Sequence, residues 1–424
     1  MTKNFKIIFF LLHLTASAFA AAEEITVSAE RPNALYQSGE KAVFIIDAPN
    51  FTEVECRFSS DGCKTIIKND KLVLNGGKGK TECVFDHPGF LFCEAAAEKD
   101  GKKIRAVGGA GFSVDKITPF TSVPEDYDAF WTAGKKELEK ISADVKLEPF
   151  KDDSSFTSFM ISFSTLAGSR LFGFLTIPKG SGPFPAYMTI ASAGVGTPKE
   201  PETTLAASGV IVLNMSVHNL PLNLAAEEYK KLDGGELKGY PRFGVPDKNA
   251  FFYRKVLLGF DRAVEYIYSR PDFDKKHFVL YGGSQGGGLS LLLTGINKKI
   301  TALISRVPAF SDHAGIINGQ RGGWPHLVEY DQAGNDKDAL LSMAAYYDTA
   351  VAVKNITVPV IMEVAFKDTI CPPTGIYAAY NVLKSPKKIF HAVDKGHFGS
   401  SQEFTEFKQQ WILSKLGLAQ KMDP

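Results

Sequence analysis

Short apolar or alternating runs, separated by polar turn segments, fill the first quarter of the chain. The runs occupy residues 25–29, 41–47, 53–58, 64–68, 71–74, 81–85, 90–95 and 105–114. Segments such as SSDG, NGGKGK and KDGKK lie between them and contain the Gly, Asp and Asn residues that favour turns. Many short strands at even spacing predict an all-β sandwich domain over residues 24–114.

The pattern changes after a linker at residues 115–124. Residues 124–141 have apolar positions at helical spacing, with acids early and lysines late, as the helix dipole favours. Apolar runs typical of buried strands then alternate with helical segments. The expected strands are 171–178, 186–191, 209–215, 277–282, 301–307, 358–366 and 387–393, and the expected helices include 251–270 and 401–417. This alternation predicts an α/β domain over residues 125–424, with a mostly parallel sheet covered by helices on both faces.

The overall composition is that of a globular protein, with 424 residues, 44% hydrophobic residues and a net charge of +1. This balance excludes a strongly basic nucleic-acid binder and predicts no general affinity for acidic membranes. Residues 1–20 have the pattern of a secretory signal peptide: Lys3 and Lys6 precede a short apolar run, and Ala18-Phe19-Ala20 is a small-x-small cleavage site. We expect a periplasmic or secreted protein without a membrane span.

Four of the cysteines, Cys56, Cys63, Cys83 and Cys93, lie in the β-domain, and Cys371 stands alone near the end. In an oxidising compartment the cluster favours at least one disulfide, with the pairing left open. The spacings do not form the paired C-x-x-C motifs of zinc sites. The run DHPG before Cys93 also resembles the corner that precedes strand F in immunoglobulin domains, which makes an immunoglobulin-like sandwich the expected topology.

Gly282-Gly283-Ser284-Gln285-Gly286 fits the G-x-S-x-G pattern. It directly follows an expected strand and leads into the helix-like run 288–296. In α/β-hydrolases the serine of such a turn is strained and exposed, and glycines two residues before and after it relieve the crowding. The sequence therefore predicts that Ser284 is a nucleophile. A phosphate-binding loop is disfavoured, because no Lys-Ser or Lys-Thr follows the glycines.

An α/β-hydrolase nucleophile is followed along the chain by an acid and then by a histidine. Asp368 comes just after the strand at 358–366, and His397 follows the strand at 387–393. Both therefore lie at the sheet edge that carries Ser284, which makes them the predicted orienting acid and general base. The rival acids are Asp394 and Asp312, and the rival bases are His391 and His218.

Two-step acyl transfer by such a triad also needs backbone donors for the oxyanion, and it requires no metal or organic cofactor. The expected donors are the amide of Gln285 and an amide of the loop ASAGVG, either that of Gly194 or that of Ala193. Trp324 and His326 lie in a long insertion between two expected strands, where either side chain could contact substrate. Core packing of Trp324 is the alternative.

Several segments together resemble carbohydrate esterase family seven, the acetyl xylan esterases and cephalosporin-C deacetylases. They are GGSQGG around Ser284, KDTICPPTGIYAAYN around Asp368, GHFG around His397, the helix YRKVLLGFDRAVEYIYSRPDFD, and VPAFSDH. The resemblance covers about residues 120–420. It implies an α/β-hydrolase fold, deacetylation of acetylated sugars, and a triad of Ser284, Asp368 and His397.

The chain departs from the family pattern at three places. His218-Asn219-Leu220 replaces an Arg-Gly-Gln motif, Gly194 replaces a tyrosine of the oxyanion loop, and Phe398 stands where Glu is common. The family also usually lacks a preceding β-domain. These departures leave the natural substrate and the oligomeric state open.

The leading interpretation is an exported serine esterase that removes acetyl groups from carbohydrates through an acyl-enzyme intermediate. The alternatives are an α/β-hydrolase of other specificity, either an esterase on another acyl group or a serine peptidase, and a non-catalytic glycan-binding protein. The expected partner is an acetylated oligosaccharide or another small ester, with no nucleic acid, and an oligomer of this chain is compatible with the sequence.

Overall fold

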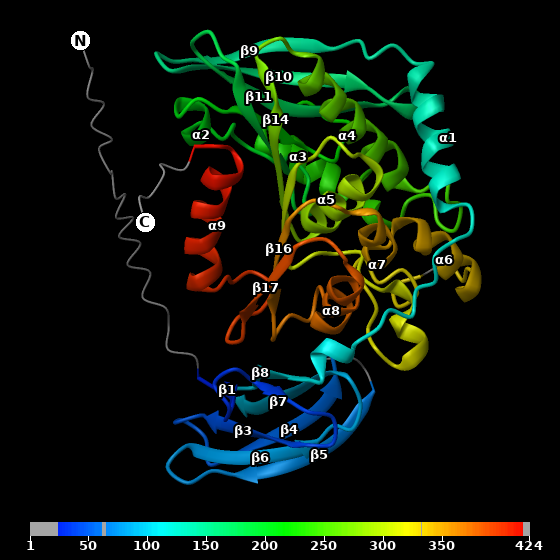
Figure 1. The fold of residues 1–424 in the computed structure, drawn as a ribbon. Helices are drawn as coiled ribbons and strands as arrows, with labels where there is room; N and C mark the ends of the chain where they lie inside the picture. Colours follow the sequence, from blue (N-terminus) through cyan, green and yellow to red (C-terminus); the bar gives the residue numbers. More distant parts are fainter. Residues whose placement is uncertain (1–23, 62–64, 332, 419–424) are drawn as a thin grey trace.

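The structure is a computed structural model that describes residues 24–61, 65–331 and 333–418. The signal segment expected at residues 1–20 lies outside this part. A small β-domain packs beneath a larger α/β-domain (Figure 1). None of the described helices is long and apolar enough to cross a membrane.

The β-domain consists of two facing sheets. Its strands are β1 (Thr26–Ala29), β2 (Leu35–Tyr36), β3 (Lys41–Asp47), β4 (Glu53–Ser60), β5 (Ile66–Val73), β6 (Lys78–Val84), β7 (Gly89–Lys99) and β8 (Lys102–Phe112). One sheet has the order β1-β3-β6 and the other the order β2-β8-β7-β4-β5. Buried and exposed residues alternate along β3 and β4, so each sheet turns one face toward a shared core that includes Phe44 and Phe58. The expected all-β sandwich is confirmed, and this grouping of strands is that of immunoglobulin-type domains.

The disulfide expected in the β-domain is absent among the cysteines that the structure describes, so that expectation is wrong for them. Cys56, Cys83 and Cys93 are buried free thiols in the sandwich core, and Cys63 lies outside the described residues. Across the β4–β7 ladder Cys56 faces Ala95 and Cys93 faces Phe58, so the two cysteines are diagonal neighbours whose thiols contact each other. They fill the core as small apolar side chains.

The α/β-domain is built on a nine-stranded sheet with the order β17-β16-β15-β14-β12-β13-β11-β10-β9. Its strands are β9 (Lys146–Asp152), β10 (Phe156–Ser164), β11 (Arg170–Pro178), β12 (Phe184–Ile190), β13 (Ile211–Met215), β14 (Phe273–Gly283), β15 (Ala302–Arg306), β16 (Val360–Ala365) and β17 (Lys387–Ala392). The strands β13, β12, β14, β15, β16 and β17, in their order across the sheet, pair in parallel. Strands β11, β10 and β9 continue the sheet with antiparallel pairing. The expected α/β-hydrolase sheet is confirmed, with an antiparallel edge that the sequence pattern did not predict.

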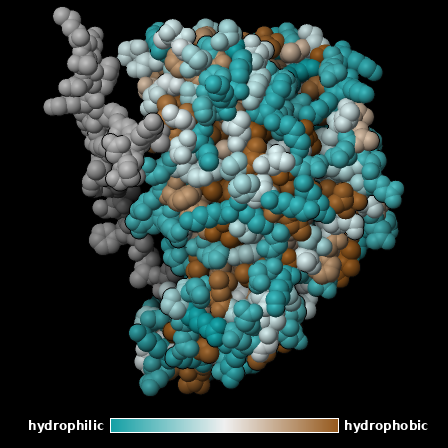
Figure 2. Space-filling model, viewed as in Figure 1, coloured by the Kyte–Doolittle hydropathy of each residue, from teal (hydrophilic) through white to brown (hydrophobic). Residues whose placement is uncertain are grey.

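Helices cover both faces of this sheet. They are α1 (Tyr127–Glu139), α2 (Thr204–Ala207), α3 (Ala226–Gly234), α4 (Phe252–Ser269), α5 (Gln285–Ile296), α6 (Lys337–Ala344), α7 (Thr349–Ala352), α8 (Pro373–Val382) and α9 (Gln402–Lys415). In Figure 1, α4, α5, α7 and α8 lie on one side of the sheet and α9 on the other. Each side has its own apolar core, with Phe260 of α4 in one and Phe404 of α9 in the other. On the face drawn in Figure 2, hydrophilic residues predominate and hydrophobic ones appear in small groups.

The two domains meet where β7 and β8 reach the segment after β16. The ring of Phe90 on β7 lies 4.9 Å from that of Phe366 and 5.7 Å from that of Tyr377 on α8. A Cβ atom added at Gly109 on β8 would lie 1.8 Å from the carbonyl oxygen of Phe366. Only glycine therefore permits this approach of the two backbones, two residues before Asp368.

Candidate active site

Ser284 occupies the sharp turn between β14 and α5, with φ 55° and ψ −123°. A Cβ atom at Gly282 would lie 2.0 Å from the carbonyl oxygen of Gly286, and one at Gly286 would lie 2.2 Å from that of Ile190. Both positions therefore require glycine, which is the physical content of the G-x-S-x-G pattern. The Ser284 amide donates a hydrogen bond to the carbonyl of Arg306 (2.9 Å) and fixes the turn against β15.

The structure brings Ser284, His397 and Asp368 into one hydrogen-bonded chain. Nε2 of His397 lies 2.8 Å from Oγ of Ser284, and Nδ1 lies 2.7 Å from Oδ2 of Asp368. The second carboxylate oxygen of Asp368 accepts the amides of Ile370 (2.8 Å) and Cys371 (2.9 Å). Asp368 is fully buried and His397 is 9% exposed. This is the geometry of a nucleophile, a base within reach of its proton, and an acid that orients the base.

The rival acids are engaged elsewhere. Asp394 forms an exposed ion pair with the neighbouring Lys395 at 2.7 Å. Asp312 is buried and accepts the amides of Phe120 (2.8 Å) and Thr121 (2.9 Å), so it holds the linker to the α/β-domain. Burial, reinforced by the nearby Asp348 carboxylate, raises the pKa of Asp312 to about 7. Neither carboxylate has a recorded hydrogen bond with His397 in the described part of the chain.

The loop that carries His397, residues 393–401, is called the base loop here. Arg306, at the end of β15, donates from Nη2 to the carbonyls of His397 (2.8 Å) and Gly399. Glu363 on β16 is fully buried and accepts from Nε of Arg306 (3.2 Å), from the Ser400 hydroxyl (2.7 Å) and from the Ser401 amide (2.7 Å). We call Arg306 and Glu363, with their contacts to the base loop, the charge clamp. The sequence did not predict it, although an acid inside the apolar run VPVIMEVAF was a signal for it.

The loop that carries Asp368, residues 366–374, is called the acid loop. At its end, the hydroxyl of Thr374 donates to Oδ1 of Asp61 (2.5 Å), which comes from the turn after β4 in the β-domain. Oδ2 of Asp61 is buried without a hydrogen-bond partner in the described part of the structure. Burial raises the pKa of Asp61 to about 7. The acid loop is therefore held between the hydrolase sheet and the β-domain.

Cys371, inside the acid loop, is a buried thiol next to two triad members. Burial, with the nearby Asp368 charge, holds its pKa well above the usual value. A nucleophilic cysteine requires the thiolate form. Cys371 is therefore a neutral packing residue and no rival to Ser284.

The expected oxyanion donors lie on two elements. The Gln285 amide opens α5 directly after Ser284, and the described contacts record no hydrogen bond from it. The Gly194 amide instead points to the Tyr240 hydroxyl, at 3.4 Å, and Ala193 is exposed in the same loop. Tyr240 and Tyr253 both donate to the Gln285 side chain (2.8 and 2.7 Å). This arrangement ties the loop after β12 to the start of α5, and both oxyanion donors stay predictions.

Neither rival base contacts Ser284 in the described residues. His391 shares a hydrogen bond with the Tyr377 hydroxyl (2.6 Å). His218 packs edge-to-face on Tyr240, with ring centroids 4.4 Å apart, and lies next to the backbone of Gly194. Burial lowers the pKa of His218 to about 4, so its ring is neutral. His218 thus packs against Tyr240, whose hydroxyl accepts the Gly194 amide of the loop after β12.

Trp324 and His326 are placed in packed surroundings. The indole of Trp324 lies edge-to-face on Phe310 at 5.6 Å, against the main core. His326 is buried against Tyr330, and burial lowers its pKa to about 4. The described contacts do not join either side chain to the triad, and a substrate contact for them stays a prediction.

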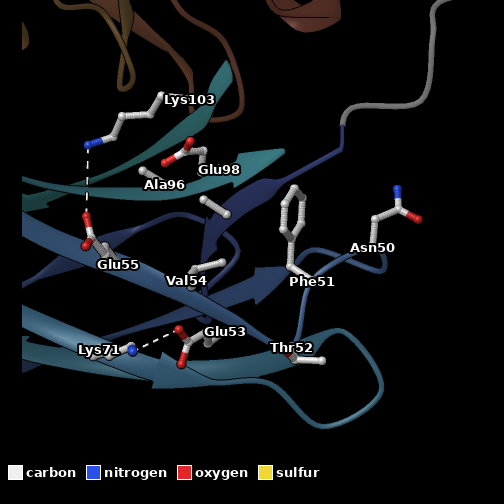
Figure 3. Close-up of a pocket in the computed structure, with 11 residues that line it drawn as sticks. Asn50, Phe51, Thr52, Glu53, Val54, Glu55, Lys71, Ala96, Glu98 and Lys103 are labelled. Carbon is white, nitrogen blue, oxygen red and sulfur yellow. Dashed lines mark ion pairs between the residues drawn. The ribbon is translucent and has the colours of Figure 1, made fainter. Parts of the chain in front are cut away.

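The β-domain has an open cavity of about 490 Å³ on the face formed by β4, β5, β7 and β8 (Figure 3). Two ion pairs are among the groups that line it: Glu53 lies 2.8 Å from Lys71, and Glu55 lies 4.0 Å from Lys103. The cavity contains no triad residue, and of its charged residues only Glu98 has no described ion pair. Among the described residues, no cluster of His, Cys, Asp and Glu is suited to hold a metal ion.

Comparisons with known proteins identify relatives of the chain by sequence and by fold. The model of the acetyl xylan esterase family (AXE1) matches residues 113–415. The chain is 31% identical over 399 residues to acetyl esterase Axe7A of Xylanibacter ruminicola, covering 90% of this chain and 88% of that protein. Acetyl xylan esterase 1 from Thermoanaerobacterium sp. JW/SL YS485 shares the fold, with a TM-score of 0.61 and 22% identity over 71% of this chain and 97% of that one. An acetyl xylan esterase from Paenibacillus sp. R4 gives the same score and identity over 71% of this chain and 98% of its own.

Proposed function

The chain belongs to the acetyl xylan esterase family, and on that premise we propose that it is an exported serine esterase that removes acetyl groups from carbohydrates. Membership makes it a carboxylic ester hydrolase. The observation that carries the proposed mechanism is the hydrogen-bonded chain from Ser284 through His397 to Asp368.

In the first step Oγ of Ser284 attacks the acetyl carbonyl carbon while Nε2 of His397 takes the hydroxyl proton. Asp368 accepts the Nδ1 proton in a hydrogen bond, which fixes the tautomer and stabilises the imidazolium that forms. Because both oxygens of Asp368 are already bonded, the carboxylate has no freedom to turn away from His397.

The negative charge on the former carbonyl oxygen is stabilised by backbone amides. The Gln285 amide is the first donor, and the loop after β12 supplies the second; each donor lowers the barrier by about 3 kcal/mol. As the tetrahedral intermediate collapses, His397 returns its proton to the sugar oxygen, and the sugar leaves as an alcohol. Water then attacks the acetyl-Ser284 ester with His397 as base, which releases acetate and restores the serine.

The decisive experiment measures acetate release from a panel of acetylated xylo-oligosaccharides and other acetylated sugars. Wild-type protein should release acetate, and Ser284→Ala should lose nearly all of this activity, by about 10⁶-fold. Ser208→Ala, at an exposed helix end, is the matched control and should retain it. Acetate release by Ser284→Ala at the wild-type rate would exclude Ser284 as the nucleophile.

The acyl group is tested with 4-nitrophenyl esters of increasing chain length. An acetyl esterase should prefer the acetate, and equal rates on longer acyl chains would favour an esterase of other specificity. Cleavage of peptides would favour a serine peptidase. Saturable binding of oligosaccharides without any turnover would point instead to a glycan-binding protein.

Export is supported by the charge and apolar pattern of residues 1–20. Expression of the full chain in a Gram-negative host should give a periplasmic protein whose N-terminus, read by mass spectrometry, begins directly after Ala20. A cytoplasmic product that retains Lys3 and Lys6 would contradict export.

A further inference from the structure

Phe398, the residue after His397, turns its side chain into solvent. It is 90% exposed, the largest exposed fraction of any large hydrophobic residue that the structure describes. The next values are 75% for Val73 and 61% for Ile317. An isolated exposed hydrophobic residue is ordinary on a protein surface. This one, however, stands beside the histidine that contacts the candidate nucleophile.

The backbone around Phe398 is fixed on both sides. The guanidinium of Arg306 holds the carbonyl before the ring, that of His397, and the carbonyl after it, that of Gly399. The Gly399 amide also donates to the Gly396 carbonyl (3.2 Å) and closes the turn. Phe398 is therefore presented from a braced loop.

The phenyl ring stands edge-to-face against the imidazole of His397, with centroids 5.2 Å apart and an angle of 86° between the rings. Nε2 of the same imidazole is 2.8 Å from Oγ of Ser284, so Phe398 packs against the very ring that contacts the group that would attack the ester. A substrate bound at Ser284 must extend away from this oxygen, and its leaving alcohol lies near His397, which gives it a proton.

Burying a phenyl side chain away from water is favourable, and the 90% exposed Phe398 gains almost none of this stabilisation from the protein itself. A ligand that covers the Phe398 ring would therefore be stabilised by burying it. A pyranose ring has an apolar face of C–H bonds that can lie on the negative face of an aromatic ring, while its hydroxyls stay at the edge in water. The leaving alcohol of a carbohydrate acetyl ester is such a ring.

We propose that Phe398 is a binding platform for a pyranose ring of the acetylated carbohydrate, and hence a specificity-determining residue. This inference rests on the proposed function and deepens it: the acetyl group is positioned by Ser284 and the oxyanion donors, and the sugar by Phe398. It assigns Phe398 to recognition of the leaving group only.

The test compares two acetate esters, an acetylated xylo-oligosaccharide and ethyl acetate, whose leaving alcohol has no ring. For Phe398→Ala, the ratio of kcat/KM on the oligosaccharide to kcat/KM on ethyl acetate should fall about tenfold, mainly through KM. Phe398→Tyr keeps an aromatic face and should restore the ratio. Phe150→Ala is the matched control, because Phe150 is 39% exposed on β9, at the opposite edge of the sheet from β17.

The other outcomes overturn the proposal in distinguishable ways. An unchanged ratio in Phe398→Ala, with normal acetate release from oligosaccharides, would refute the role of Phe398 as a binding platform without contradicting the proposed esterase function. Equal losses on both esters would mean that Phe398 acts through the position of His397. A change of oligomeric state on size-exclusion chromatography, with the ratio unchanged, would make the ring a contact between copies of this chain. Absence of acetate release from every sugar by wild-type protein is a failure of the proposed function itself.

Discussion

The acid loop and the base loop follow neighbouring parallel strands, β16 and β17, yet the protein supports them in different ways. The acid loop is enclosed: Asp368 is fully buried, and the β-domain presses on Phe366 and Thr374. The base loop is open to solvent on one side. The Arg306–Glu363 ion pair holds it on the other, and Phe398 on the solvent side is 90% exposed.

The difference follows from what each loop does in the proposed reaction. Of the groups that react, the acid contacts only His397, so its burial does not hinder the substrate, and burial strengthens its hydrogen bonds. The base must face Ser284 and the leaving alcohol, so its loop has to be held from one side. The acid loop is therefore held mainly by steric packing against the β-domain, whereas the base loop is held mainly by the Arg306–Glu363 ion pair. The predictions below test this contrast in order of their expected effect on turnover.

The largest effect is expected from Asp368→Asn. The amide would present a donor to Nδ1 of His397 and favour the wrong tautomer, so kcat should fall by about 10⁴-fold with little change in KM. Initial rates on an acetate ester measure this directly. Asp394→Asn is the matched control, since its carboxylate is paired with Lys395 at the surface and should matter little. A larger loss in Asp394→Asn than in Asp368→Asn would reverse the assignment of the acid.

The charge clamp under the base loop should give the next largest effect. Glu363→Gln removes the charge that pairs with Arg306 and weakens the hold on the carbonyls flanking Phe398. We expect kcat to fall by about tenfold to hundredfold through misplacement of His397, and unfolding free energy to fall by about 3 kcal/mol. Glu403→Gln, in an exposed pair with Lys388 (3.6 Å), is the control and should cost less than about 1 kcal/mol. Normal turnover in Glu363→Gln would show that the clamp serves stability alone.

The steric support of the acid loop is tested at Gly109. In Gly109→Ala the new methyl group meets the rigid carbonyl of Phe366, so we expect a stability loss of about 1–3 kcal/mol together with a several-fold fall in kcat. Gly108→Ala is a neighbouring control that points to the other face of β8. There the methyl group meets a Val27 side-chain carbon at 2.7 Å inside the β-domain. Gly108→Ala should reduce stability without lowering kcat. A similar kcat for Gly108→Ala and Gly109→Ala would mean that packing of the β-domain does not affect the triad.

The same contrast explains what the sequence could and could not predict. The sequence could single out Ser284, Asp368 and His397 as candidates, which the structure brings together, because each follows an apolar strand in a fixed chain order, which is local information. Glu363 and Arg306 were missed because their partners come from other strands and from the base loop. The edge strand β9 was missed because every one of its residues is exposed, so it has no buried alternation to read. The contact of Gly109 with Phe366 depends on docking of the two domains, and no pattern along the chain encodes that.

The smallest effect on turnover is expected from Asp61→Asn, whose signature is a pH dependence of stability. The folded pKa of Asp61 is about 7, above the value of an unfolded aspartate, because burial disfavours the charged form. Between about pH 4 and pH 7 the folded state therefore binds more protons than the unfolded state, and unfolding free energy falls as the pH rises, by roughly 2–4 kcal/mol, then levels off. Asn can still accept the Thr374 hydroxyl and cannot ionise, so this component disappears in the variant.

Because burial also raises the pKa of Asp312 to about 7 and that of Asp348 to about 6, the informative quantity is a difference. Urea unfolding of wild type and of Asp61→Asn from pH 4 to pH 8 should give stabilities that shift in favour of the variant as the pH rises. Asp100→Asn, at the exposed turn between β7 and β8, should track the wild type throughout. A constant difference between wild type and Asp61→Asn would mean that Asp61 is ionised at the domain junction, and that the acid loop, like the base loop, is held by charge.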